Sequence, residues 1–227
     1  MPFNGFTRGT LDYFLSMKFD NSKTNFETNK QLYIDCVRDP LRGLFAELVP
    51  AMLAIDGSIC VKQSRCVSGA YNDARFSRAE PVKCYMYLHF CAQTPCYEDG
   101  NVPGFFMDAS HDGYRYGLQL YRQTTSGMKA IRDAAYNDQK NFMKIAKAIE
   151  KNNFSLEGGD YKTDRYPDAI PEIKKWLNKK TWWIGKTRDI DEIFLSNKLA
   201  CELAENFKAL APLYKFILRC GFYDYVI

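Results

Sequence analysis

The hydrophobic pattern of the chain changes period twice, and this change constrains the fold more than any other feature. Apolar residues recur at helical spacing up to about residue 55, and the helical period returns from about residue 125. Between these regions, residues 83–92 and 105–122 are rich in aromatic residues, which favour strands. Helices, then strands, then helices predict an α+β fold in which N-terminal and C-terminal helices flank a central antiparallel sheet.

Turn signals indicate how the predicted strands are connected. The Asp-Gly pair at 112–113 separates residues 105–110 from residues 114–122 and predicts a β-hairpin. Residues 58–67 alternate loosely between apolar and polar, so we expect a strand there. A further short strand is expected at 181–185.

Helices are predicted on both sides of this sheet. On the N-terminal side we expect a helix over 8–18, a second after the capping side chains at 20–24, and a third that begins at Pro40 and is interrupted or kinked at Pro50. On the C-terminal side we expect a helical stretch from 125 to 153, a short helix over Pro171–Leu177, and a long helix from Asp191 or Ser196 to Arg219. The buried candidates of this last helix are Leu199, Leu203, Phe207, Leu210 and Phe216. No repeat or linker is visible, so we expect a single domain over residues 1–227.

Composition limits the kinds of protein that this chain can be. With 227 residues, 46% of them hydrophobic, it is long enough to bury a substantial core. The net charge of +4 does not predict nucleic acid as a partner, because that requires a concentrated basic face. The longest apolar run, 48–55, is too short to span a bilayer, and the N-terminus shows no secretory signal. We therefore expect a cytoplasmic protein with no membrane partner, and its oligomeric state stays open.

The eight cysteines do not form a metal-binding pattern. There is no CxxC pair, and neither histidine lies near a cysteine at metal-site spacing, so no metal or other cofactor is expected. Without a secretory signal, disulfides are not expected either. Most of the cysteines stand beside aromatic or branched residues, which is typical of small buried hydrophobic side chains.

Standard catalytic motifs are absent from the chain. We find no Walker loop, GxGxxG, HExxH or GxSxG, and the glycine pair at 158–159 predicts a turn. His89 lies inside a predicted strand, where a core or edge histidine is the simplest interpretation. His111 falls in the hairpin turn and is expected to be a solvated loop residue.

Residues 72–83, NDARFSRAEPVK, are the best candidate for a binding site. Charged side chains are concentrated there, at the point where a loop enters the strand predicted at 83–92. Arginine is suited to bidentate contact with carboxylate or phosphate, and Asp73 is placed to orient Arg75. The alternative is a surface turn with screened ion pairs, which contribute little to stability.

This segment resembles the signature of a bacterial family of unknown function, domain-of-unknown-function family 2461, which has the form R-x-x-R-D-x-R-F-S-K-D-K-x-P-Y-K. The matching residues of this chain are Asp73, Arg75, Phe76, Ser77, Arg78, Pro81 and Lys83. The resemblance runs over nearly the whole length and includes Arg132, which follows Met-Lys-Ala-Ile. The departures are Gly69 and Asn72 at the two leading arginines, Ala79 in place of a charged pair, and Val82 in place of a tyrosine. The resemblance implies no reaction, because the family is uncharacterised.

The first hypothesis is a binding module for a small anionic ligand that carries phosphate or carboxylate. Asp73 would hold Arg75 in place, and Phe76 and Ser77 would complete the segment. The basic residues expected at the anion are Arg75, Arg78 and Lys83, with Arg115, Arg122 or Arg132 arriving from neighbouring elements.

Two alternatives remain open at the same segment. The chain would be a hydrolase-like enzyme on an anionic substrate if Asp73 acts as a general base or metal ligand beside Arg75. It would have a structural role if Asp73 and Arg75 form a buried ion pair that fixes the turn.

Overall fold

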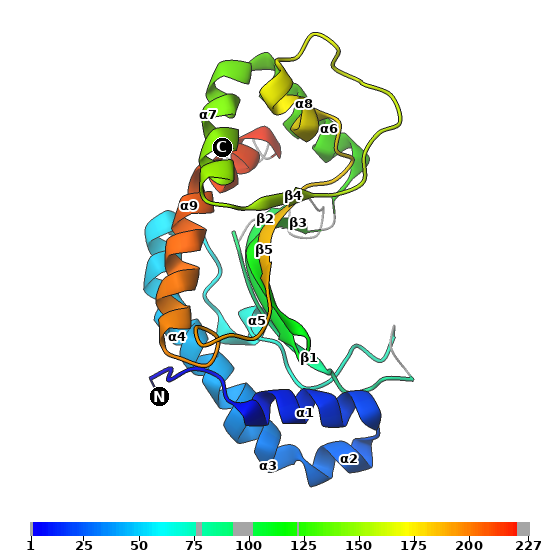
Figure 1. The fold of residues 1–227 in the computed structure, drawn as a ribbon, viewed down its shortest axis with the longest axis vertical. Helices are drawn as coiled ribbons and strands as arrows, with labels where there is room; N and C mark the ends of the chain where they lie inside the picture. Colours follow the sequence, from blue (N-terminus) through cyan, green and yellow to red (C-terminus); the bar gives the residue numbers. More distant parts are fainter. Residues whose placement is uncertain (1, 76–78, 93–101, 122, 222–227) are drawn as a thin grey trace.

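A five-stranded antiparallel sheet lies at the centre of the described chain (Figure 1). The computed structural model describes residues 2–75, 79–92, 102–121 and 123–221. The strands lie in the order β1-β2-β3-β5-β4, with bounds Tyr85–Cys91 (β1), Val102–Ser110 (β2), Gly113–Tyr121 (β3), Trp183–Arg188 (β5) and Ser155–Glu157 (β4). The predicted hairpin is confirmed, because Ser110 pairs with Gly113 where β2 turns into β3. The α+β fold with a central antiparallel sheet is therefore correct.

The N-terminal helices occupy one end and one side of the sheet (Figure 1). Ser22 begins the second helix as predicted, because its hydroxyl accepts a hydrogen bond from the Asn25 backbone N–H at 3.1 Å. Pro40 lies in the first turn of its helix, and Pro50 lies inside that helix without ending it. The bounds are Arg8–Phe19 (α1), Lys23–Thr28 (α2), Lys30–Tyr33 (α3), the π-helical turn Ile34–Arg38 (η1) and Asp39–Ile55 (α4).

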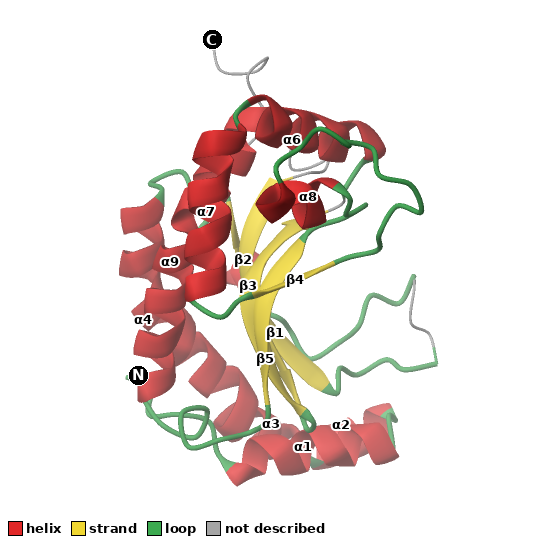
Figure 2. Cartoon of the chain, turned by 45° about the horizontal axis from the view of Figure 1, so that its top comes forward, coloured by secondary structure: helices red, strands yellow, loops and turns green. Residues whose placement is uncertain are grey.

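The C-terminal helices are Thr125–Asn137 (α6), Gln139–Lys151 (α7), Pro171–Leu177 (α8) and Lys198–Gly221 (α9). The stretch predicted from 125 to 153 is two helices, because the backbone at Asp138 leaves the helical region at φ −125° and ψ 53°. α9 lies beside α4, and together they cover one face of the sheet (Figures 1 and 2). Within the described ranges, none of the helices has both the length and the apolar character needed to cross a membrane.

The core lies between that covered face and the two helices. Phe90 of β1 stacks on Phe45 of α4 with ring centroids 5.5 Å apart, and Phe105 of β2 packs against Phe207 and Tyr214 of α9. Each fully buried large apolar side chain contributes about 1.5–3 kcal/mol. Because side chains alternate along a strand, the neighbours of these residues point to the opposite face, which α4 and α9 leave open.

Residues 58–67 do not form the predicted strand. They contain a short helix, α5 (Gln63–Cys66), and only isolated bridges, Ile59 with Ala92 and Val67 with Leu88. Four consecutive polar residues, 62–65, give no alternating apolar face, whereas one helical turn buries Cys66 and lets its backbone N–H donate to the Lys62 carbonyl at 3.2 Å.

Residues 158–159, predicted as a turn, form only a bend after a short strand that the sequence did not reveal. β4 pairs with β5 over three residues only, with Leu156 opposite Ile184. Gly158 bends the chain at φ +133°, where a side chain would overlap the Thr181 carbonyl. The chain then continues alongside the segment before β5, since the Lys180 backbone N–H donates to the Gly159 carbonyl at 2.6 Å and Asp160 pairs with Lys179. Three residues are too few to show an alternating pattern, which is why the strand escapes prediction.

Candidate functional site

The segment that carries the sequence signature is a narrow loop that extends the sheet beyond β1. Tyr71 pairs with Val82, and the Asn72 backbone N–H donates to the Pro81 carbonyl at 2.9 Å. Figure 1 shows this loop projecting from the molecule at the end of β1. Three of the predicted site residues, Phe76, Ser77 and Arg78, lie outside the described residues.

Asp73 and Arg75 form an ion pair at the surface. The Arg75 Nη2 and Nε atoms donate to the Asp73 carboxylate at 2.6 Å and 3.0 Å, and the Arg75 backbone N–H donates to it at 3.0 Å. These hydrogen bonds lower the pKa of Asp73 to about 2. The side chains are 44% and 80% exposed, so the pair is not the buried ion pair that the structural hypothesis requires.

Lys83 lies near this pair, whereas Arg132 does not. The Lys83 ammonium donates to the Tyr71 carbonyl, and desolvation lowers its pKa while the charge of Asp73 opposes that change. Arg132 belongs to α6, which Figures 1 and 2 place at the other end of the sheet from the loop. The structure therefore brings Asp73, Arg75 and Lys83 together and leaves Arg132 apart.

Arg132 is almost completely buried, at 2% exposure. Its Nη1 donates to the carbonyls of Lys179 and Lys180 at 3.1 Å and 3.3 Å, and its Nη2 donates to the Tyr161 hydroxyl at 3.2 Å. Through these hydrogen bonds, the Arg132 guanidinium holds the segment that follows α8 against α6.

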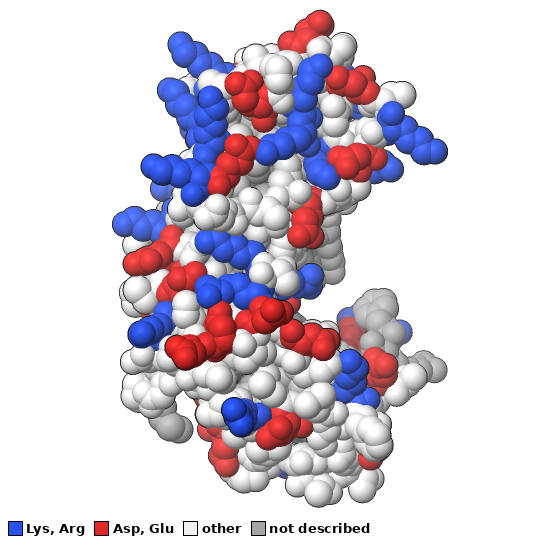
Figure 3. Space-filling model, viewed as in Figure 1, with Lys and Arg blue, Asp and Glu red and all other residues white. Residues whose placement is uncertain are grey.

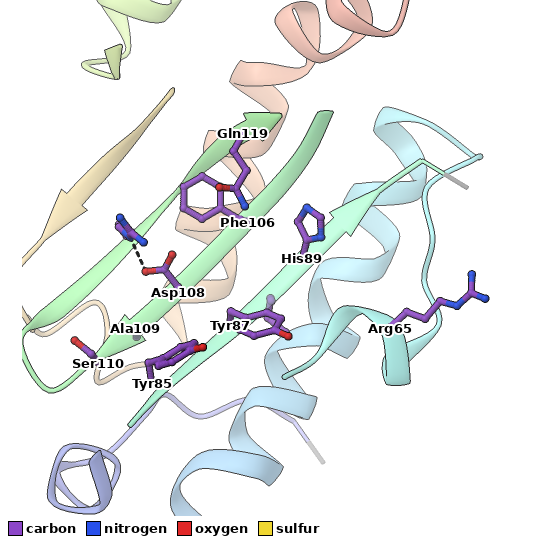
Figure 4. A pocket seen from close by; sticks show the side chains of 11 residues that line it. Arg65, Tyr85, Tyr87, His89, Phe106, Asp108, Ala109, Ser110 and Gln119 are labelled. Atoms are coloured by element: carbon purple, nitrogen blue, oxygen red, sulfur yellow. Dashed lines mark hydrogen bonds and ion pairs between the residues drawn. The ribbon is translucent and has the colours of Figure 1, made fainter. Parts of the chain in front are cut away.

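A pocket of about 670 Å³ lies on the open face of the sheet. Figure 3 shows the molecule hollowed beside this face, between the α6–α8 region and the 72–83 loop. Figure 4 shows side chains from three adjacent strands and α5 around the pocket. The lining residues are Arg65 from α5; Tyr85, Tyr87, Leu88 and His89 from β1; Phe106, Asp108, Ala109 and Ser110 from β2; and Arg115 and Gln119 from β3.

Arg115 is the best-positioned cation of this pocket. It pairs with Asp108 across β2 and β3, and its Nε donates to the Asp108 Oδ1 at 2.7 Å (dashed line in Figure 4). On its other side it lies over the ring of Trp183, 5.7 Å from the centroid. The two Nη groups of Arg115 make no hydrogen bond to any residue in the described part of the chain. Arg115 is therefore anchored by one nitrogen, and its two terminal nitrogens have no hydrogen-bond partner within the described residues.

Two glycines make room for rings on this face. The ring of His89 crosses to β2 and occupies the space above Gly104, where a Cβ would overlap Nε2. In β5, a Cβ on Gly185 would lie 2.7 Å from the Trp183 ring, which folds back along its own strand. Trp183 in turn contacts Phe106 at 5.4 Å between centroids. The missing side chains at these two positions therefore let the His89 and Trp183 rings lie against the sheet.

Burial changes the protonation of two pocket residues. Desolvation raises the pKa of Asp108, and the Arg115 guanidinium only partly opposes this. Desolvation also lowers the pKa of His89 to about 4, so its imidazole is neutral at pH 7. Among the described residues, no group of three or more His, Cys, Asp or Glu side chains is placed to hold a metal ion.

The signature loop borders the pocket through Tyr85. The Tyr85 hydroxyl donates to Asn72 Oδ1 at 3.4 Å, and its ring stacks on Tyr87 at 6.4 Å. Of the cations expected from neighbouring elements, Arg115 lies in this pocket, Arg132 does not, and Arg122 lies outside the described residues. The other pocket residues were missed, although their alternation along the strands is a usable signal: polar or aromatic residues at every second position face away from the apolar core.

The fold and the pocket together define an α+β protein whose antiparallel sheet is covered by helices on one face and carries a polar, aromatic-walled pocket on the other. The chain belongs to the family described as "Conserved hypothetical protein (DUF2461)", whose model matches residues 9–216. A comparison with curated proteins gave no match.

Proposed function

We propose that this protein binds a small anionic ligand, bearing phosphate or carboxylate, in the pocket on the open sheet face. The proposal rests on one observation, the hydrogen bonding of the Arg115 guanidinium. Its Nε is held by Asp108 while both Nη groups lack a partner among the described residues. Such an arginine is preorganised for bidentate contact with an oxyanion.

The charge balance of the pocket supports an anion. Its ionised side chains are Arg65 and Arg115 against the single carboxylate of Asp108, because His89 is neutral at pH 7. The described charged residues of the loop that borders the pocket, Asp73, Arg75, Glu80 and Lys83, add no net charge, so the excess comes from the pocket itself. The excess of positive charge raises the local concentration of anions.

The role of the signature loop in this proposal is to border the pocket. Asp73 fixes Arg75, and the Lys83 ammonium donates to the Tyr71 carbonyl within the loop. Phe76, Ser77 and Arg78 are assigned no role in the pocket.

Arg132 is assigned to holding the chain after α8 in place, because its hydrogen bonds are to protein carbonyls and Tyr161.

A cytoplasmic location fits the state of the cysteines. Those described are free thiols, and Cys60, Cys66 and Cys91 are buried. Free cysteines in this number are typical of a reducing compartment.

Calorimetric titration with phenyl phosphate and with benzoate tests the binding function. Arg115→Lys keeps the positive charge but loses the planar fork, so affinity should fall about tenfold, which corresponds to about 1.4 kcal/mol. Arg75→Lys is the matched control, since it changes the other arginine that is paired with an aspartate, and its affinity should stay within about twofold.

Two results would overturn the proposal. If Arg75→Lys weakens binding and Arg115→Lys does not, the anion is held by the 72–83 loop and not by the pocket. If neither phenyl phosphate nor benzoate binds, the binding function itself is wrong.

The pKa and the position of Asp108 favour a second candidate function, hydrolysis of an anionic substrate. Asp73 is a poor general base because its pKa is only about 2. Burial raises the pKa of Asp108, which also lies beside the guanidinium that would stabilise developing charge. A screen of phosphate monoesters and carboxylic esters, with Asp108→Asn as control, tests this candidate. Equal turnover by the two proteins would exclude Asp108 as the base.

A further inference from the structure

The residues that line the pocket indicate the shape and the aromatic character of the ligand, in addition to its charge. On the open face, Asp108 has Tyr87 opposite it on β1, Arg115 opposite it on β3, and Phe106 two residues along its own strand. Cross-strand neighbours lie about 4.5–5.5 Å apart, and residues two apart on a strand lie about 6.6–6.8 Å apart. An acid group on Arg115 therefore has Phe106 at the diagonal position on the next strand and Tyr87 one strand further away, beyond Asp108.

The rings are held in place by further aromatic contacts. Tyr87 stacks on Tyr85 at 6.4 Å with an interplanar angle of 26°, and Phe106 packs on Trp183 at 5.4 Å. Phe106 is only 3% exposed, so its position is fixed by packing, and the half-buried Tyr87 is the ring that offers more surface to a ligand. Rings that do not move offer a preformed surface to a flat ligand, which reduces the entropy lost on binding.

The end of the pocket away from Ser110 is neutral and polar. Gln119 pairs with Gly104, which the His89 ring covers. The Gln119 side-chain amide makes no hydrogen bond to a residue in the described ranges, and it offers both a donor and an acceptor. A neutral polar group of a ligand would find a partner there, whereas a second charge would not.

The size of the pocket also favours a small organic ligand over a bare inorganic anion. A volume of about 670 Å³ falls within the range of sites for small organic molecules. A phosphate or acetate ion on Arg115 would leave most of this space and all of the aromatic surface uncovered.

We infer that the ligand is a flat aromatic anion, with its acid group on Arg115, its ring between Tyr87 and Phe106, and a neutral polar substituent directed at Gln119. This inference rests on the proposed function and specifies its ligand class. An aromatic carboxylate and an aromatic phosphate ester share this chemistry.

The experiment compares four probes on the full chain: benzoate with acetate, and phenyl phosphate with inorganic phosphate. Each aromatic probe should bind at least tenfold more tightly than its small partner. Tyr87→Leu should remove most of that difference. Tyr136→Leu, an aromatic change on α6, should leave it intact. Circular dichroism and thermal melting of each variant confirm that it is folded before titration.

A second readout is built into the chain, which contains three tryptophans. Trp183 contacts Phe106 and Arg115, whereas Trp176 and Trp182 are buried against Phe142. In ¹H–¹⁵N spectra, the Trp183 indole signal should shift on addition of benzoate or phenyl phosphate. The signals of Trp176 and Trp182 should stay in place and act as internal controls.

The neutral end is tested with 4-hydroxybenzoate against benzoate. The para hydroxyl should improve affinity several-fold in the natural protein, and Gln119→Leu should abolish this gain.

The outcomes separate the inference from the function on which it rests. Binding of benzoate alone identifies the carboxylate form, and binding of phenyl phosphate alone identifies the phosphate form. If the small anions bind as tightly as their aromatic partners and Arg115→Lys weakens all of them, the anion site stands and the aromatic class is wrong. If none of the four probes binds, both this inference and the proposed function are wrong.

Discussion

Asp108 and Arg115 face each other in register across β2 and β3, joined by an Nε–Oδ1 hydrogen bond of 2.7 Å. The bond fixes the guanidinium, but it also places a negative charge beside the atoms that we propose contact an anion. Asp108 therefore has two opposite effects on anion affinity, one through position and one through charge.

Substitution of Asp108 should separate these effects. Asp108→Asn keeps an oxygen that accepts from Arg115 Nε and removes the charge, so phenyl phosphate should bind about threefold to tenfold more tightly. Asp108→Leu removes both the charge and the acceptor, so the guanidinium loses its anchor and the gain should disappear. Isothermal titration of both variants measures the difference. Equal affinities for the two variants would show that Asp108 does not position Arg115.

Stability should depend on pH through His89. Burial lowers the pKa of His89 from its ordinary value of 6.5 to about 4 in the folded protein, so the unfolded chain binds the proton more readily. The stabilisation is fully present above pH 6.5 and is lost as the pH falls from 6.5 to about 4. The loss attributable to His89 is about 3 kcal/mol. Urea unfolding at a series of pH values between 4 and 7.5 measures it.

Histidine variants identify the source of that slope. The chain contains only one other histidine, His111. His89→Gln should flatten the stability profile between pH 6.5 and 4, whereas His111→Gln should leave the contribution of His89 in place. A profile that stays equally steep in His89→Gln would assign the pH dependence to other groups.

The parts of the fold that the sequence predicted correctly are those with strong local signals. The Asp-Gly turn between two aromatic runs predicted β2 and β3, and Pro171 and the apolar spacing after it predicted α8. The parts that failed have weak local signals or depend on a distant strand. Residues 58–67 alternate weakly, and β4 exists only because β5 lies beside it at Ser155–Glu157. The sequence around residues 155–157 gives no sign of this pairing with β5.

The site was predictable only in part for a similar reason. The Asp73–Arg75 pair follows from spacing two residues apart, and the structure has it as a direct ion pair. The pocket depends on which face of the sheet α4 and α9 cover, and this is decided by packing across the whole chain. Arg132 has the sequence context of the family signature, but its burial against Lys179 and Lys180 is a tertiary property.

Arg132 should contribute to stability and not to anion affinity. Arg132→Met retains the length of the side chain but leaves the Lys179 and Lys180 carbonyls and the Tyr161 hydroxyl without their donor, so unfolding should become easier by about 2–4 kcal/mol. Arg165→Met is the matched control, because Arg165 lies over the same Tyr161 ring at 3.8 Å but is exposed. Its cost should stay below about 1 kcal/mol. Urea unfolding and benzoate titration together check both statements, and a loss of benzoate binding in a folded Arg132→Met protein would return Arg132 to the site.

Gly104 should tolerate no side chain, because the His89 ring occupies the space in which a Cβ would lie. Gly104→Ala forces the imidazole out of its position on the open face, and overpacking of this kind costs about 1–3 kcal/mol. Gly69→Ala is the matched control, since a Cβ there meets nothing within 4 Å. Thermal melting should show a clear drop for Gly104→Ala and no drop for Gly69→Ala. The His89 ring signals in NMR spectra should move in the first variant alone, since the added methyl group displaces the ring toward the pocket. Equal melting temperatures with unchanged His89 signals would mean that the ring does not lie over Gly104.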